Sequence, residues 1–327
     1  MNADLDGLLK SQDQDEKKFK IKEIRKMAAA NSEIEITGKP VWFITGCSTG
    51  FGRELAKHAL ECGYRAVVTA RNPKDIIDLA ANGDALVLRL DVTDQGHIDA
   101  AIKEAVEKFG RIDVLVNHAG ICYFSSVEES EEIQVRRMFE INVFGLSRMI
   151  HAALPGMRRR RKGFIINFSC IGGLRSFPLL GYYNATKFAV EGLSEALWQE
   201  VEPLGIKVML VEPNGFLSGW DGHQATESKR HIEDYAARAG AWSSQVRTIS
   251  GKQPGDPVRA AHLIVKATES LNPPHRLLLG SDAYEAATNK LEDLRKEFSR
   301  LESVSRMADF PNNMQKQTEW TVPMTTG

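Results

Sequence analysis

The stretch VWFITGCSTGFG, residues 41–52, decides the fold. Its first four residues are apolar enough for a buried strand, the glycine-rich part predicts a turn, and a helical pattern follows from Arg53. In such a turn one glycine permits the sharp bend, a second lets backbone N–H groups approach a pyrophosphate, and a third lets the helix pack against the strand. A glycine-rich turn without a ligand is the alternative, but the strand before it and the helix after it favour a phosphate-binding site for a dinucleotide. The cofactor-binding residues predicted here are Gly46, Ser48, Gly50, Phe51 and Gly52.

Six more apolar runs follow, separated by stretches of helical length. Strands that are apolar throughout are usually buried on both faces, and their alternation with helices implies parallel strands joined by crossovers. The sequence therefore predicts an α/β, doubly wound (Rossmann) fold of about seven parallel strands flanked by helices, in a single domain. The predicted strands are 41–45, 66–70, 85–90, 112–117, 164–169, 206–212 and 276–280. The predicted helices are 52–62, 95–109, 131–154, 184–201 and 257–270, and in the fourth of these Ala189, Leu193, Leu197 and Val201 form one apolar stripe.

The chain divides into three parts. Residues 1–38 are polar and of mixed charge, which indicates a mobile or partly helical extension, and Met27 within it offers an alternative start. Residues 39–306 form the predicted domain, with a substrate loop at about 214–254, and 307–327 form a tail. The loop carries Trp220, His223, His231, Tyr235 and Trp242, which either line a pocket for a large apolar substrate or pack to hold the loop. Near its end, Leu291, Leu294, Phe298 and Leu301 predict an amphipathic helix that covers the core or a neighbouring subunit rather than a membrane.

Composition excludes several classes of partner. A net charge of −1 gives no electrostatic reason to expect nucleic acid, and the basic run at 158–162 is interpreted as a solvated helix end. No apolar run approaches the ~20 residues that a membrane span needs, and the N-terminal sequence lacks the apolar core of a secretory signal. The cysteines show no metal-ligand spacing, so no metal site is expected. A cytoplasmic location is the resulting expectation.

Tyr183 and Lys187 lie four residues apart, on one face of a predicted helix. A neighbouring ammonium stabilises a phenolate, so the pair is suited to proton transfer near neutral pH. Such pairs are common at protein surfaces, and the residues around this one give it weight. Ser169 closes the preceding strand, and Asn142 lies in the helix before that strand. Two other strands end in Asn117-His118-Ala119-Gly120 and Pro213-Asn214-Gly215.

Together these motifs closely resemble the short-chain dehydrogenase/reductase family from about Val41 to Asp282. The resemblance implies a catalytic tetrad of Asn142, Ser169, Tyr183 and Lys187. In it, Tyr183 exchanges a proton with the alcohol or carbonyl oxygen, which Ser169 also hydrogen-bonds. Lys187 holds the nicotinamide ribose and lowers the pKa of the tyrosine, while Asn142 holds a water that links Lys187 to solvent. The further cofactor-binding residues implied are Asp91, Val92, Asn117, Ala119, Gly120, Tyr183, Lys187, Pro213 and Gly215.

The second strand decides between the two dinucleotides. In proteins that bind NAD, a carboxylate at the end of this strand usually binds the ribose 2′-hydroxyl. This chain has Arg71 at that position instead. A guanidinium suits the 2′-phosphate of NADP, so NADP(H) is favoured over NAD(H), unless Arg71 is only a solvated loop residue. The chain departs from the family pattern at His118, which we interpret as a structural or cofactor-edge residue, and at Asn214.

The sequence thus predicts an NADP(H)-dependent oxidoreductase that interconverts a secondary alcohol and a ketone or aldehyde, with Tyr183 as general acid/base. One alternative is a silent NADP(H)-binding sensor, although such proteins typically lack the tyrosine or the lysine. Another is an epimerase or dehydratase of the extended type, which shares the tyrosine–lysine pair but normally has a T-G-x-x-G-x-x-G turn. The family resemblance also implies a small-molecule substrate, and a homodimer or homotetramer packed through the helices after the fourth and fifth strands.

Overall fold

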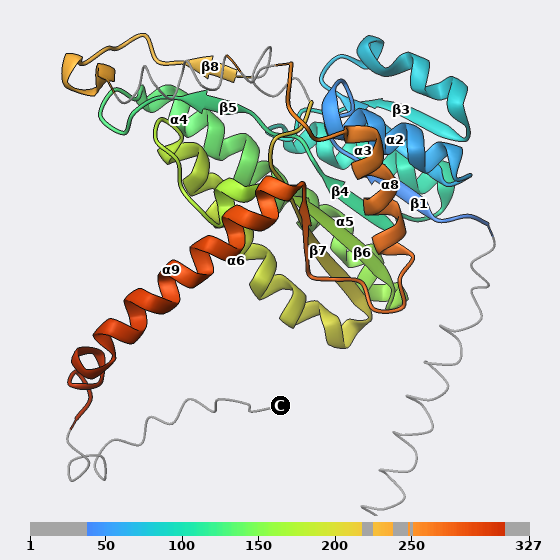
Figure 1. The fold of residues 1–327 in the computed structure, drawn as a ribbon. Coiled ribbons are helices and arrows are strands. Elements are labelled where there is room, and N and C mark those ends of the chain that lie inside the picture. Colours follow the sequence, from blue (N-terminus) through green and yellow to red (C-terminus); the bar gives the residue numbers. More distant parts are fainter. Residues whose placement is uncertain (1–37, 218–224, 238–247, 249–250, 311–327) are drawn as a thin grey trace, which may run out of the picture.

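The structure is a computed structural model that describes residues 38–217, 225–237, 248 and 251–310 (Figure 1). Met27, Trp220, His223 and Trp242, which the sequence analysis singled out, lie outside these residues. So do most of the N-terminal extension and of the C-terminal tail. The proposed limits of the domain, the extension and the tail therefore stay predictions.

Seven parallel strands form one sheet in the order β3-β2-β1-β4-β6-β7-β9. From β1 the chain adds strands on one side as far as β3, then returns to the other side with β4, so the sheet is doubly wound. At its centre Phe43 of β1 lies opposite Val67 of β2 and Leu115 of β4. The predicted fold is confirmed. The strands are β1 Val41–Ile44, β2 Arg65–Ala70, β3 Ala85–Arg89, β4 Val114–Asn117, β6 Gly163–Phe168, β7 Ile206–Pro213 and β9 Arg276–Leu279.

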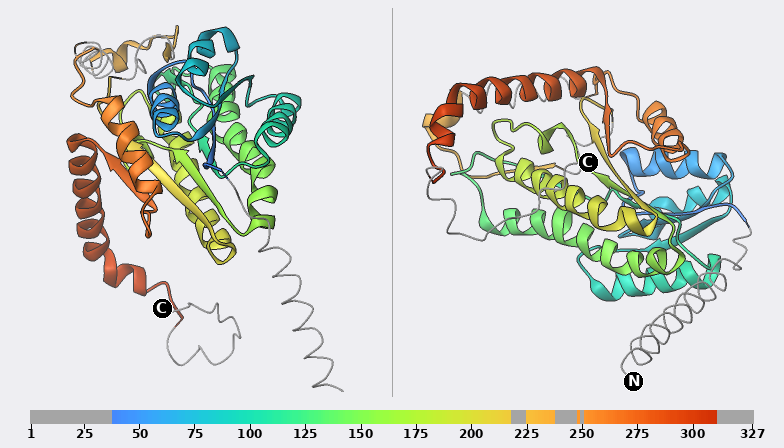
Figure 2. Two further views of the ribbon diagram at one scale, coloured as in Figure 1. Left: turned by 90° about the vertical axis from the view of Figure 1, so that its right-hand side faces the viewer. Right: turned by 90° about the horizontal axis from the view of Figure 1, so that it is seen from below.

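Helices bury both faces of the sheet, and Figure 2 shows α8 and α5 on opposite sides of it. Trp42 and Ile44 of β1 join one apolar cluster, whereas Val41 and Phe43 join the other, because side chains alternate along a strand. The first cluster includes α2 Gly50–Glu61, the 3-10 helix η1 Pro73–Asn82 and α8 Pro257–Thr268. The second includes α3 Gln95–Phe109, α5 Leu146–Arg160 and α6 Gly181–Val201. Short 3-10 turns, η3 Ile171–Gly173 and η4 Glu202–Leu204, follow β6 and α6.

The helix predicted at 131–154 forms, but it contains a π-helical segment and ends later than predicted. Helix α4 Glu132–Phe139 is followed by the π-helical segment, η2 Glu140–Gly145, and then by α5. Helix α5 passes through Pro155 and ends only at Arg160. The wider π turn contains Asn142, one of the predicted site residues, and such segments often occur at functional sites.

A small second sheet joins the substrate loop to the body of the protein, and the sequence analysis did not predict it. Strand β5 Cys122–Phe124 pairs in parallel with β8 Ala225–Glu227. Beside them, the Glu129 carboxylate accepts hydrogen bonds from Ile232 N and Ser126 Oγ, both at 2.6 Å. Tyr235 donates a hydrogen bond to Glu128 Oε2 (2.6 Å) at the surface. Tyr235 therefore fits the interpretation in which loop aromatics hold the loop in place.

Helix α9, Ser281–Arg306, extends away from the sheet (Figure 1). Leu291 and Phe298 on its apolar face are 67% and 65% exposed, and Leu301 is also exposed. These three side chains do not cover the core of this chain. The expectation that the apolar face of this helix packs on the core is therefore wrong for them. Cover by a neighbouring subunit stays a prediction. No helix among the described residues has the length and apolarity to cross a membrane.

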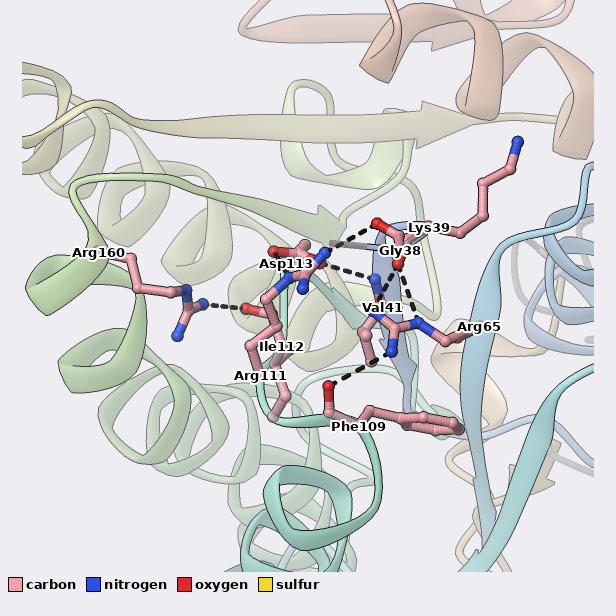
Figure 3. Close-up of polar contacts among 9 residues, drawn as sticks. All are labelled: Gly38, Lys39, Val41, Arg65, Phe109, Arg111, Ile112, Asp113 and Arg160. Atoms are coloured by element: carbon pink, nitrogen blue, oxygen red, sulfur yellow. Dashed lines mark hydrogen bonds and ion pairs between the residues drawn. The ribbon is translucent and has the colours of Figure 1, made fainter. Parts of the chain in front are cut away.

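Arginine side chains hold together the edge of the sheet where β1, β2 and β4 begin (Figure 3). Arg65 donates two hydrogen bonds to Lys39 O, at 2.7 and 2.9 Å, and Arg111 pairs with Asp113. Asp113 also accepts a hydrogen bond from Val41 N (2.8 Å). Arg160, from the basic run at 158–162, donates to Ile112 O instead of pointing into solvent. These contacts lie at the end of the sheet opposite to the carboxyl ends of the strands.

Candidate active site

A cavity of about 360 Å³ lies at the carboxyl ends of β1, β4, β6 and β7. This is where open parallel sheets bind their ligands, on either side of the point at which the strand order reverses. Apolar side chains line much of it, among them Ile121, Phe177 and Leu180. The predicted site residues that line it are Gly50, Phe51, Gly120, Ser169, Tyr183, Lys187, Pro213 and Gly215.

The glycine turn requires its glycines. Gly46 and Gly50 have φ of +74° and +59°, a backbone region in which side chains are strained. Gly52 lies on the buried side of α2, where an added Cβ would come within 2.5 Å of His118 Nδ1 and 3.1 Å of Gly46 C. The turn thus brings the N-terminus of α2 to the cavity with its backbone uncovered, which is the arrangement that binds a pyrophosphate.

Hydrogen bonds fix the turn after β4 against the glycine turn. Thr45 Oγ1 accepts from His118 N at 3.0 Å and from Ala119 N at 3.1 Å. His118 Nδ1 lies 3.0 Å from Gly46 O. Burial lowers the pKa of His118 to about 4, so the ring is neutral at physiological pH and can donate to that carbonyl. The geometry supports the structural interpretation of His118.

We expect this histidine to make stability depend on pH. The pKa of His118 is about 4 in the folded protein and 6.5 in an unfolded chain, so its contribution to stability is full above pH 6.5 and is lost as the pH falls towards 4. Both proteins should become less stable when the pH is lowered from 7.5 to 4.5. The decrease in the free energy of unfolding should be smaller in His118→Asn than in wild type, by on the order of 2 kcal/mol. Urea denaturation at both pH values measures the difference. Equal losses in the two proteins would show that His118 contributes nothing to it.

Tyr183 and Lys187 are neighbours in the lining of the cavity. Both are on α6 and both are buried, at 7% and 8% exposure. Lys187 Nζ lies 5.7 Å from the centroid of the Tyr183 ring and donates a hydrogen bond to Phe168 O (2.8 Å). Ser169, the residue after β6, is 3% exposed and is held by a hydrogen bond from its N to Val211 O (2.9 Å). The structure therefore brings these three predicted residues together.

Asn142 lies beside this group and makes contacts that the sequence analysis did not foresee. Its side chain pairs with the backbone of Ile121, accepting from N and donating to O, both at 2.9 Å. Asn142 Nδ2 also lies 3.2 Å from Thr186 Oγ1, next to Lys187 in the chain. Asn142 thus joins η2, the segment after β4 and α6. The implied water link to Lys187 stays a prediction.

The remaining predicted cofactor residues follow the same edge of the sheet but do not line the cavity. Arg71 follows β2 and is exposed, and its charge acts on Asp91, which follows β3. Burial works to raise the pKa of Asp91, but two hydrogen bonds from Thr93 and the charge of Arg71 hold it below its usual value. The others in this group are Gly46, Ser48, Gly52, Val92, Asn117 and Ala119.

Several residues that shape the site were missed. Thr45 was visible in the glycine motif, and its role depends on contacts between two strand ends that the sequence does not display. Asn167 accepts from Asn117 Nδ2 and donates to Ser194 Oγ, both at 2.9 Å, and so supports the end of β4. Cys170 lines the cavity and makes a hydrogen bond with Tyr183. Its position directly after Ser169 in the sequence could have indicated that it lies at the site.

The fold and the site define a Rossmann-fold protein with a buried tyrosine–lysine pair at the end of its sheet. The family model described as short chain dehydrogenase matches residues 40–228. A short-chain dehydrogenase from Streptomyces avermitilis is 40% identical and has a TM-score of 0.78, over 84% of this chain and 100% of that one. The chain belongs to the short chain dehydrogenase family and is an oxidoreductase.

Two curated relatives have comparable identity. "Oxidoreductase BOA17" from Botryotinia fuckeliana is 36% identical, over 78% of this chain and 93% of its own length. "3-ketodihydrosphingosine reductase" from Bacteroides thetaiotaomicron is 37% identical, over 72% of this chain and 86% of its own length. The similarity in each case extends well beyond the glycine turn.

Proposed function

We propose that this oxidoreductase interconverts a secondary alcohol and a ketone or aldehyde, using NADP(H), with Tyr183 as the general acid/base. The observation that carries the proposal is the burial of Tyr183, Lys187 and Ser169 in the lining of one cavity. A phenol, an ammonium and a hydroxyl in this arrangement are suited to exchange a proton with one substrate oxygen.

In the direction of reduction, Tyr183 Oη donates its proton to the carbonyl oxygen while Ser169 Oγ hydrogen-bonds the same oxygen. The charge of Lys187 stabilises the phenolate that Tyr183 becomes. In the direction of oxidation the phenolate takes the proton back. The nicotinamide cofactor, when bound, supplies or accepts the hydride.

The residues at the ends of β1, β2 and β3 fit a dinucleotide. The glycine turn leaves the N-terminus of α2 open to a pyrophosphate, and a side chain at Gly52 would collide with the turn itself. Proteins of this fold from Burkholderia phymatum and from a metagenome have been solved with NAD and with NADP, respectively, so the fold does not select between them. The preference for NADP(H) rests on the exposed guanidinium of Arg71.

The lining of the cavity supports an apolar substrate. Ile121, Phe177, Leu180 and Phe216 line the same cavity as Tyr183. An apolar ketone would bury its surface against these four side chains, although Asn214, Gln253 and Asp282 line the same cavity. The Bacteroides relative is named as a reductase of a keto compound.

Oxidation of NADPH with a panel of apolar and polar ketones and aldehydes tests the proposal. Turnover with ketones of the apolar group is the expected result. Tight NADPH binding without turnover on any compound would favour the silent sensor, and conversion of a nucleotide sugar without net change in the cofactor would favour the epimerase.

We also propose that the chain forms a homodimer or homotetramer through the helices after β4 and β6. Phe144, Phe188 and Leu193 on these helices are exposed, which supports an apolar contact. We expect Leu193→Glu to shift the sedimentation coefficient towards that of a 36.4 kDa monomer. Ile77→Glu, an equally drastic change at an exposed site on η1, should leave it unchanged. Sedimentation of the wild type as a monomer would contradict the proposal.

A further inference from the structure

A second group of charges lies buried behind the active site. Glu191 on α6 is 5% exposed and Glu212 on β7 is 0% exposed. Arg276 at the start of β9 contacts both through Nη1, with Glu212 Oε1 at 2.8 Å. Arg276 Nη2 also pairs with the more exposed Glu195 at 3.1 Å. Buried charges are costly, so an arrangement that places two carboxylates on one guanidinium calls for a physical reason.

One of the two carboxylates is the better candidate to stay ionised. Burial, together with the negative charge of Glu191, raises the pKa of Glu212 to about 7. Near neutral pH, Glu212 therefore takes up a proton, which leaves the Arg276 guanidinium to pair with the carboxylate of Glu191. Glu191 Oε1 and Glu212 Oε2 are both buried without a hydrogen-bond partner among the described residues.

Glu191 lies against the active site. It follows Lys187 by four residues, so both side chains are on the same buried face of α6. A Cβ added at Gly173 would meet Glu191 Oε1 at 2.9 Å and would collide with Ser169 Oγ as well. The glycine at 173 thus lets the carboxylate and the serine hydroxyl approach the same point from two sides.

Lys187 needs a counter-charge. Burial lowers the pKa of Lys187, and the groups that oppose this effect are Cys170, Glu191 and Cys122. Burial raises the pKa of both thiols, so they are neutral at physiological pH and contribute no charge. His118, on the β4 side, is neutral as well. Among the groups that act on Lys187 in the described structure, Glu191 is the one carboxylate.

We propose that Glu191 is a positioning residue for the proton-transfer pair: its carboxylate is the internal counter-charge that keeps Lys187 protonated beside Tyr183. Arg276 and Glu212 hold this carboxylate in place. The consequence for catalysis rests on the proposed role of Tyr183 and Lys187, because only a charged Lys187 stabilises the phenolate. The charge state of Lys187 is independent of any turnover and can be measured by itself.

The decisive experiment follows the titration of Lys187 by NMR in protein labelled with ¹³Cε-lysine, with the signal assigned from Lys187→Arg. We expect Glu191→Gln to lower the midpoint by at least one pH unit, which is a tenfold change in the protonation equilibrium. Glu195→Gln is the matched control, since it removes a carboxylate from the same helix and the same arginine without facing Lys187. Its midpoint should equal that of the wild type. A wild-type midpoint in Glu191→Gln would overturn the proposal.

Two further measurements keep the proposal testable if Glu191→Gln does not fold. A fully buried lysine without a counter-charge titrates as low as about pH 5–6. The wild-type midpoint should therefore lie above this range, and a midpoint within it would refute the role of Glu191. Glu191→Asp retains the charge, so its midpoint should stay within half a unit of the wild type.

The pH profile of the reaction separates this inference from the proposed function. The alkaline limb of kcat/KM should move to lower pH in Glu191→Gln and return in Glu191→Asp, while Glu195→Gln follows the wild type. If no substrate is turned over, the proposed function fails but the titration still decides the role of Glu191. If the midpoint of Lys187 shifts in Glu191→Gln but the alkaline limb of kcat/KM does not, Glu191 keeps Lys187 protonated without any effect on the reaction. The positioning role would then be wrong.

Discussion

Tyr183→Phe is expected to lower kcat by about a thousandfold or more, in keeping with the 10²–10⁴-fold that a positioned acid/base contributes. The change removes one oxygen and leaves a ring of the same shape in a buried site, so the fold and the cavity should persist. The affinity for NADPH, measured by fluorescence titration, should change by no more than a few fold. Steady-state reduction of the best ketone of the panel measures the loss.

Tyr182 provides a matched control for this variant. It precedes Tyr183 in α6 and packs in the same apolar cluster, yet it does not line the cavity. Tyr182→Phe should therefore retain nearly all of the wild-type kcat. Turnover that survives Tyr183→Phe would remove Tyr183 from the chemistry, and an equal loss in both variants would point to packing of α6 instead of proton transfer.

The sheet could be predicted because each strand carries its own signal. The run 206–212 is apolar except at Lys207 and Glu212, and β7 forms at Ile206–Pro213 with both faces covered. The glycine turn was equally readable, since its glycines stand in one continuous segment whose spacing reports the backbone shape. Local patterns of this kind do not depend on which distant segments meet.

Features that depend on distant partners could not be predicted. Strands β5 and β8 are three residues each, and they form because the substrate loop returns to pair with Cys122–Phe124. Arg276 lies 85 residues from Glu191 and 64 from Glu212, so nothing in the sequence shows that one guanidinium joins them. Asn142 was found through the family resemblance, but the π turn that contains it has no simple sequence pattern.

Helix α6 shows how a functional site overrides a simple pattern. The spacing of Ala189, Leu193, Leu197 and Val201 predicted one apolar stripe, but Leu193 is 38% exposed, so the stripe is wrong at that position. The buried face contains Lys187, Glu191 and Ser194 instead. Ser194 is buried there because it accepts a hydrogen bond from Asn167 Nδ2 at the end of β6.

The second large effect is expected from Arg71→Asp, which should reverse or abolish the preference for NADPH. In the wild type, the guanidinium would pair with the 2′-phosphate of NADPH, and hydrogen bonds to charged groups contribute about 1.5–3 kcal/mol each. An aspartate repels that phosphate and instead accepts a hydrogen bond from the ribose hydroxyl of NADH. The ratio of kcat/KM for NADPH to that for NADH should therefore fall by roughly 100- to 1000-fold.

The control for Arg71→Asp must make the same change of charge at a position far from the predicted cofactor site. Arg158→Asp does so, because Arg158 is exposed at the end of α5, near the opposite edge of the sheet. It should leave the cofactor ratio unchanged, while Arg71→Gln should give a value between those of the wild type and Arg71→Asp. The exposure of Arg71 means that thermal stability should stay within about 0.5 kcal/mol of wild type. A ratio that does not move in Arg71→Asp would show that another group reads the ribose, and the preference for NADP(H) would then have no residue to support it.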